Sequence, residues 1–191
     1  MKYTFLLLAT AVCCLLSCKK ETKSVYEACC GVEPLNDVVS ITLATEINGV
    51  TFDTTFLSGI YIPNIFIPDN SGSNDLFIVF GGQGVEKIVS AVYTDEAGQQ
   101  LFKKENFLPN DTGAAWDGKR SDGSFYKGLF HYDVNILFID GKSKTYSGDA
   151  CAVPCQPDGF PADHLPKCAF PNQNSGYGSW DPTIPGETGC F

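Results

Sequence analysis

The stretch "GLFHYDVNILFID", Gly128–Asp140, decides the fold because its side chains alternate in character. Five apolar or aromatic residues fall on one side of an extended chain: Phe130, Tyr132, Val134, Ile136 and Phe138. Three polar residues fall on the other side: His131, Asp133 and Asn135. A period of two predicts a β-strand with one face buried and the other in solvent.

Similar short runs occupy the chain from residue 35 to residue 150, and turn signals separate them. The runs are "VVSITLATEI", "VTFDTTFL", "GIYIPNIFIP", "DLFIVF", "VEKIVSAVYTD", "QQLFKKENF" and "KSKTYSG". Asn48-Gly49 and Asp140-Gly141 are dipeptides of the type I′ hairpin turn. No run keeps a helical period. We therefore predict an all-β, antiparallel β-sandwich of about seven to nine strands, with a core rich in aromatic residues.

The first eighteen residues, "MKYTFLLLATAVCCLLSC", predict the compartment. Lys2 precedes an apolar run, Phe5 to Leu16, of signal-peptide length. The run ends in Leu-Leu-Ser-Cys, which resembles the lipobox of bacterial lipoproteins. The resemblance implies a signal peptide over residues 1–17, an acylated Cys18, and a lipidated tether over residues 18–34. We expect a lipoprotein of the cell envelope, held in the outer membrane; the alternative is an ordinary signal peptide cut elsewhere.

Six of the nine cysteines remain after Cys13, Cys14 and Cys18 are set aside. They are Cys29, Cys30, Cys151, Cys155, Cys168 and Cys190. An even number outside the cytoplasm favours disulfides, and the spacing leaves all pairings open. Because a bridge between neighbours is strained, we expect Cys29 and Cys30 to reach different partners. Zinc is the alternative, but no matching cysteine knuckle is present.

Residues 151–191 differ from the sandwich in composition. Seven of the eleven prolines lie there, and proline cannot donate to a β-ladder. We predict an irregular extension that disulfides pin to itself and to the tether. Its stretch "NQNSGYGSW", with Tyr177 and Trp180, is typical of either a recognition loop or a linker.

The formal net charge of −9, without a cluster of Lys or Arg, argues against nucleic acid as a partner. It argues equally against electrostatic binding to anionic lipid.

Four blocks of this chain resemble the gliding-motility-associated C-terminal domain. "IPNIFIPDNSGSNDLF" is similar to the family's opening motif through these positions: Pro63, Asn64, Phe66, Pro68, Gly72, Asn74, Asp75 and Phe77. "SAVYTDEAGQQLF" matches its middle block through Tyr93, Gly98, Leu101 and Phe102. "WDGKRSDGSFYKGLFHYDV" matches the later block through Trp116, Asp117, Gly118, Gly128, Phe130 and Tyr132, and "DGKSKTYSG" looks like the closing hairpin.

The resemblance covers about residues 60 to 148, with the blocks in family order. It implies an immunoglobulin-like sandwich of seven strands and a role as a type IX secretion signal. This chain departs from the family pattern because a Cys- and Pro-rich stretch of about forty residues follows the domain and because it carries a lipobox.

Two acidic loops are candidate metal sites. Asp69, Ser71, Asn74 and Asp75 lie at the spacing of a calcium loop, but Ser71 replaces the family's Asp, and calcium needs about six to eight oxygens. The alternative is a tight turn, which Asn and Asp favour. A turn is also favoured for Asp111, Asp117 and Asp122. We expect no obligatory cofactor.

Catalysis has little support in the sequence. We expect His131 to face solvent, and neither it nor His164 has a recognisable nucleophile partner. We expect Trp116 to pack at the sandwich edge, a sugar contact being the alternative. The sequence thus predicts a non-enzymatic, lipid-anchored protein whose sandwich binds a protein or a polysaccharide. The alternatives are an accessory or sorting component of type IX secretion or gliding, and a divergent carbohydrate-active enzyme.

Overall fold

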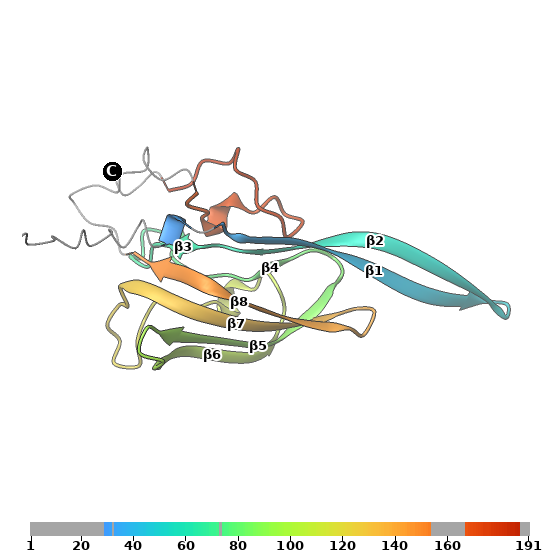
Figure 1. The fold of residues 1–191 in the computed structure, drawn as a ribbon, viewed down its shortest axis with the longest axis horizontal. Coiled ribbons are helices and arrows are strands. Elements are labelled where there is room, and N and C mark those ends of the chain that lie inside the picture. Colours follow the sequence, from blue (N-terminus) through green and yellow to red (C-terminus); the bar gives the residue numbers. More distant parts are fainter. Residues whose placement is uncertain (1–28, 32, 73, 154–166, 188–191) are drawn as a thin grey trace, which may run out of the picture.

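The computed structural model describes residues 29–31, 33–72, 74–153 and 167–187, which form two packed β-sheets (Figure 1). The strands are β1 (Leu35–Ile47), β2 (Val50–Ile62), β3 (Ile65–Phe66), β4 (Phe80–Gly81), β5 (Val85–Asp95), β6 (Gln100–Phe107), β7 (Gly128–Phe138) and β8 (Ser143–Ala152). One sheet has the order β1-β2-β4 and the other β3-β8-β7-β5-β6. The predicted all-β sandwich is confirmed.

Two single 3₁₀ turns, η1 (Thr112–Ala114) and η3 (Pro171–Gln173), accompany the strands, and Cys29 and Cys30 are helical. Within the described ranges, no helix has the length and apolarity needed to span a bilayer.

One strand pair departs from the antiparallel prediction. Ile65 and Phe66 of β3 pair in parallel with Cys151 and Ala152 of β8. The chain leaves β2 at Ile62 and enters β3 three residues later, so it changes sheets at this corner without reversing direction. The two sheets are therefore joined at the β3–β8 edge by backbone as well as by side chains.

The inward face of β7 is buried as its alternation predicts, and its exposed fractions run from 0% to 4%. Two side chains of this face, Phe130 and Tyr132, belong to an aromatic cluster. The other members are Phe66, Phe77, Tyr93, Trp116 and Tyr126. Neighbouring rings in the cluster meet mostly tilted or edge to face at centroid distances near 5 Å, for example 4.9 Å between Phe77 and Phe130. Such pairs add about 0.5–1.5 kcal/mol each to the burial of their area. The predicted aromatic core is confirmed.

The β1–β2 hairpin is longer than the sequence runs suggested. The thirteen residues of β1 pair with β2 without interruption, from Leu35–Ile62 to Ile47–Val50. Gly59, which sequence reasoning placed at a break between two runs, lies inside β2. A Cβ there would meet the backbone oxygens of Tyr177 and Gly178 at 2.7 and 2.6 Å, so this glycine serves a close contact and not a turn.

The two hairpin turns differ from each other. Asn48 and Gly49 have φ values of 53° and 78°, the two positive angles of the predicted type I′ turn. At the β7–β8 connection only Gly141 is left-handed, with φ of 80°, and the Phe138 N–H donates to the Lys142 carbonyl. That loop has three residues, a type I turn followed by a G1 bulge. The predicted hairpin is confirmed there, but the predicted turn type is wrong.

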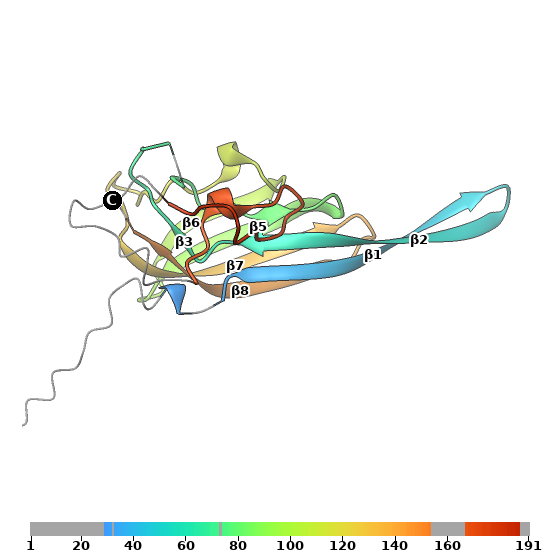
Figure 2. The ribbon, with the colours of Figure 1, turned by 90° about the horizontal axis from the view of Figure 1, so that it is seen from above.

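The described part of the C-terminal extension forms a third layer over the outer face of the β1-β2-β4 sheet (Figures 1 and 2). Tyr61 of β2 is fully buried beneath it, beside Phe80, Ala169 and Trp180. The Tyr61 hydroxyl donates to the Phe170 carbonyl over 2.7 Å. Residues 167–187 are therefore part of the fold, held by packing and hydrogen bonds in addition to a disulfide.

Disulfides join the extension to the N-terminal segment. Cys29 pairs with Cys151 at the end of β8, and Cys30 pairs with Cys168, with Cα–Cα distances of 5.6 and 4.5 Å. The prediction that the neighbouring cysteines reach different partners is confirmed. Cys18, Cys155 and Cys190 lie outside the described residues.

One acidic side chain clamps β1 to the opposite sheet. The Asp37 carboxylate accepts from the Lys144 ammonium over 2.7 Å and from the Tyr146 hydroxyl over 2.8 Å, both on β8. The hydrogen bond from Lys144 is the main reason why the pKa of Asp37 is lowered; partial burial opposes it, and the Tyr146 bond adds to it. Burial, followed by the Asp37 contact, raises the pKa of Tyr146.

Asp37→Asn is expected to lower the free energy of unfolding at pH 7 by about 1 kcal/mol, because the clamp is partly exposed. The lowered pKa means that the contribution is present above the unfolded-state pKa, about 3.9, and is lost as the pH falls through the folded-state pKa. Urea unfolding of the unchanged protein and of Asp37→Asn, measured between pH 7 and pH 2, tests this pH dependence. Asp53→Asn removes the same charge from the exposed end of the hairpin and should cost nothing. A stability difference for Asp37→Asn that persists at pH 2 would contradict the clamp.

Candidate functional site

The loop after β3, residues 67–75, is a turn whose acidic oxygens accept backbone N–H groups. One Asp75 oxygen accepts from Gly72 over 2.6 Å, and the other accepts from Ser71 and Asp69 at 3.2 and 3.3 Å. Asp69 itself accepts from Ser71 over 2.8 Å. Asn70 takes the left-handed conformation, with φ of 62°, as the tight-turn alternative requires.

The calcium ligand set is therefore not brought together as a cage. Asn74, the remaining candidate, points its amide at the C-terminal layer: its oxygen accepts from the Asn172 N–H and its nitrogen donates to Glu187, both over 2.9 Å. Within the described ranges, no three His, Cys, Asp or Glu side chains lie close enough to hold a metal.

Asn64, at the β2–β3 corner, also hydrogen-bonds the C-terminal layer. Its side chain is 2% exposed, donates to the Lys167 carbonyl and accepts from the Ala169 N–H, both over 2.8 Å. Its backbone bonds Ala169 and Cys151 as well. Two asparagines of the opening motif thus hold the C-terminal layer in place.

The Trp116–Gly118 block packs against the loop after β3, at Pro68. Trp116 is 2% exposed and its indole N–H donates to the Lys119 carbonyl over 2.9 Å, so packing is confirmed and no face is open to a sugar. Gly118 has φ of 76°, and a Cβ there would lie 2.4 Å from the Pro68 Cβ. The proline of the first motif therefore rests on the glycine of the third.

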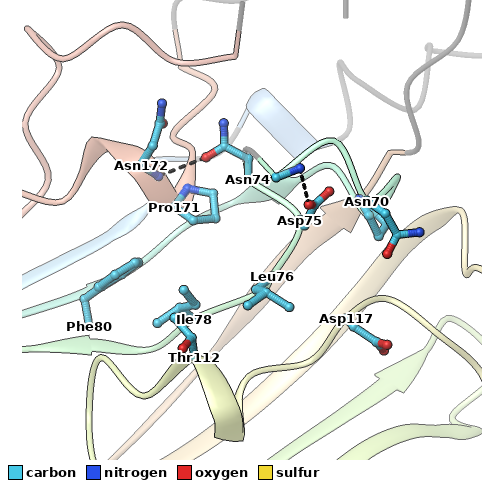
Figure 3. Close-up of a pocket in the computed structure, with 12 residues that line it drawn as sticks. Asn70, Asn74, Asp75, Leu76, Ile78, Phe80, Thr112, Asp117, Pro171 and Asn172 are labelled. Atoms are coloured by element: carbon cyan, nitrogen blue, oxygen red, sulfur yellow. Dashed lines mark hydrogen bonds between the residues drawn. The ribbon is translucent and has the colours of Figure 1, made fainter. Parts of the chain in front are cut away.

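A cleft of about 530 Å³ opens where these segments meet the C-terminal layer (Figure 3). It is lined by Pro68, Asn70, Gly72, Asn74, Asp75, Leu76, Ile78, Phe80, Thr112, Asp117, Pro171 and Asn172. Leu76, Ile78 and Phe80 form an apolar side of the cleft, and Asn70 and Asp117 lie at its polar end. Mixed linings of this size are typical of ligand sites.

The polar end of the cleft is rich in hydrogen-bond acceptors. Partial burial opposes ionisation of Asp117, but the hydrogen bonds from the ammonium and the backbone N–H of Lys119, together with the positive charge of Lys119, outweigh it and lower the pKa. Asp117 is therefore charged at neutral pH, and Thr112 and Asn70 are exposed on the rim. The arrangement suits a ligand that presents N–H or O–H donors.

The remaining candidates lie elsewhere. Asp111 and Asp122 accept the backbone N–H two residues ahead, from Gly113 and Ser124, as the predicted turns require. His131 is half exposed on the outer face of β7 and pairs with Asp149 of β8, away from the cleft. Its predicted solvent-facing position is confirmed. His164 lies outside the described residues.

Sequence reasoning missed the side of the cleft that the C-terminal layer supplies, Pro171 and Asn172. The stretch "NQNSGYGSW" is seated on the sheet by Gly178: a Cβ there would lie 2.5 Å from both the Gly59 oxygen and the Gly82 nitrogen. Tyr177 remains 80% exposed. The small residues around Tyr177, two glycines and two serines, were the sequence feature that could have indicated a close backbone contact here.

No protein-family model matches this chain, and no curated protein matches it either.

Gly178→Ala should detach the C-terminal layer, because the added Cβ meets backbone that cannot move aside. Gly176→Ala is the matched control: its φ of 84° is left-handed like the 70° of Gly178, but nothing lies within 4 Å of its Cβ. Both variants carry a left-handed alanine, which costs about 1–2 kcal/mol. Only Gly178→Ala should also speed hydrogen exchange across residues 167–187, measured by mass spectrometry. Equal exchange in the two variants would show that the close contact does not hold the layer.

Proposed function

We propose that this chain is a non-enzymatic, lipid-anchored protein of the cell envelope whose sandwich presents a binding cleft to a polymer, either a protein segment or a polysaccharide. The observation that carries the proposal is the cleft between the opening motif, the Asp117 turn and the C-terminal layer. Its walls come from three segments that are far apart in sequence, and disulfides and buried asparagines fix the layer that closes it. Such pre-organisation lowers the entropic cost of binding.

The residues that line the cleft favour binding of a polymer through hydrogen bonds over catalysis on a substrate. The two carboxylates in the cleft are already occupied, Asp75 by backbone N–H groups and Asp117 by Lys119. The pKa of Asp117 is lowered, whereas a general acid needs a raised pKa. The apolar side of the cleft, with Leu76 and Ile78 half-buried, offers a surface for a sugar ring or an aliphatic side chain.

The gliding-motility resemblance supports an immunoglobulin-like module here. Its motif residues Phe66, Phe77, Trp116 and Phe130 meet in one cluster and carry the fold. Other motif residues line the cleft: Pro68, Gly72, Asn74, Asp75 and Asp117. A sorting role in type IX secretion is the second candidate, favoured by Asn64 and Asn74, the motif asparagines that grip the following layer.

The anchor is tested at Cys18. Cys18→Ala should abolish incorporation of labelled palmitate and release the protein from the membrane fraction, because no other thiol follows the lipobox pattern. Cys14→Ala, four residues earlier within the signal segment, should keep both. Persistence of the label in Cys18→Ala would exclude this anchor.

The cleft is tested with two matched leucines. Leu76→Glu places a charge on the apolar side of the cleft, whereas Leu108→Glu places the same charge at an exposed leucine outside it. Glycan arrays, and photocrosslinking in cells from position 112 on the rim, should reveal one polymer class. Leu76→Glu should weaken that signal at least tenfold and Leu108→Glu should not. A signal that both variants keep would place binding elsewhere on the molecule.

A further inference from the structure

The β1–β2 hairpin runs well beyond the sandwich. Its outer half, residues 42–55, extends past the other strands in both views (Figures 1 and 2), and we refer to it as the arm. Of the arm's residues, Leu43 alone is partly buried, and the rest are exposed. A two-stranded ribbon is marginally stable in water without a packed face.

The alternation of the covered half continues into the arm. Side chains on the face that bears the buried Ile41 and Ile60 continue as Leu43, Thr45, Ile47, Val50, Phe52 and Thr54. Side chains on the opposite face are Thr42, Ala44, Glu46, Thr51, Asp53 and Thr55. The first face is apolar and uncharged, and the second carries both of the arm's charges.

The inner face of the arm is thus the uncovered continuation of the sandwich core. Ile47, Val50 and Phe52 are 56%, 54% and 51% exposed. Strands with one covered face show this pattern, whereas strands in water on both sides do not need it. A contiguous apolar patch on an otherwise polar surface marks an interaction site.

We propose that the arms of two copies of this chain pack inner face to inner face, each arm supplying the layer that the other lacks. The inner face carries no charged side chain, because Glu46 and Asp53 lie on the opposite face, so two copies meet there without like charges in contact. The net charge of −9 opposes association at long range, and salt screens this repulsion. A second arm also offers a two-stranded apolar face of the same length.

The area suits such a pair. Each arm would bury on the order of 500–600 Å² from its apolar and threonine side chains, so that the pair reaches about 1,000 Å², the lower bound for a specific interface. The expected association is therefore weak and reversible in solution, and a shared membrane would strengthen it through effective concentration. The arm points away from the end of the sandwich that holds β3, so the cleft stays open in the pair (Figure 1).

The full chain, purified in detergent, is tested by sedimentation over a wide concentration range. Thr45→Lys and Thr51→Lys add the same charge at exposed threonines of the same arm, on the inner and the outer face respectively. Thr45→Lys should raise the dimer dissociation constant at least tenfold, and Thr51→Lys less than twofold. Equal melting temperatures would show that both variants fold.

A photocrosslinker at position 52 should join two copies, and the same group at position 51 should not. A chain that stays monomeric at every concentration and gives no crosslink from position 52 would overturn the proposal. Equal effects of the two lysines would overturn it too. So would a crosslink from position 52 to lipid or to a different protein in place of a second copy.

Discussion

The bond from Cys30 to Cys168, next to the bond from Cys29 to Cys151, fixes where the C-terminal layer begins. Because the first two cysteines are neighbours, the two bridges together close the chain between Cys151 and Cys168, a loop of about 17 residues. Closing a loop of about this length restricts the unfolded chain by about 3 kcal/mol. The layer therefore starts at the β3–β8 edge, within reach of the buried Asn64 amide, and from there it can only run across the outer face of the β1-β2-β4 sheet.

The cleft follows from that path. Asn74 meets Asn172 because the layer passes the opening loop, and Pro171 and Asn172 become a wall. At Tyr177 and Gly178, farther along the chain, the layer lies close to the sheet because Gly59, Gly82 and Gly178 carry no Cβ where three backbones meet. The wall of the proposed binding cleft that the C-terminal layer supplies lies outside the aromatic core, so a substitution there would leave that core intact.

The cleft and the arm divide the molecule into two working surfaces. One is acidic, concave and pre-organised, and the other is apolar, flat and projecting. Because the two surfaces are separate, the proposed self-association and the proposed ligand binding would not compete. A lipid anchor would hold both surfaces at a membrane, where weak contacts act at high local concentration.

The sequence by itself determined the strands and their faces, since period-two alternation in residues 128–140 depends only on local geometry and on which side chains avoid water. It also determined the Asn48-Gly49 turn, whose positive φ angles few other residues tolerate. It determined that Cys29 and Cys30 would separate, but not their partners. Only the tertiary structure decided the partners, the parallel β3–β8 pair and the place of Gly59 inside β2, because each depends on contacts between residues far apart in the chain. The role of the acidic loop that contains Asp69 and Asp75 was also decided by the tertiary structure. Its composition allows either a metal cage or a turn. The structure shows a turn, because the carboxylate oxygens accept hydrogen bonds from backbone N–H groups of the same loop.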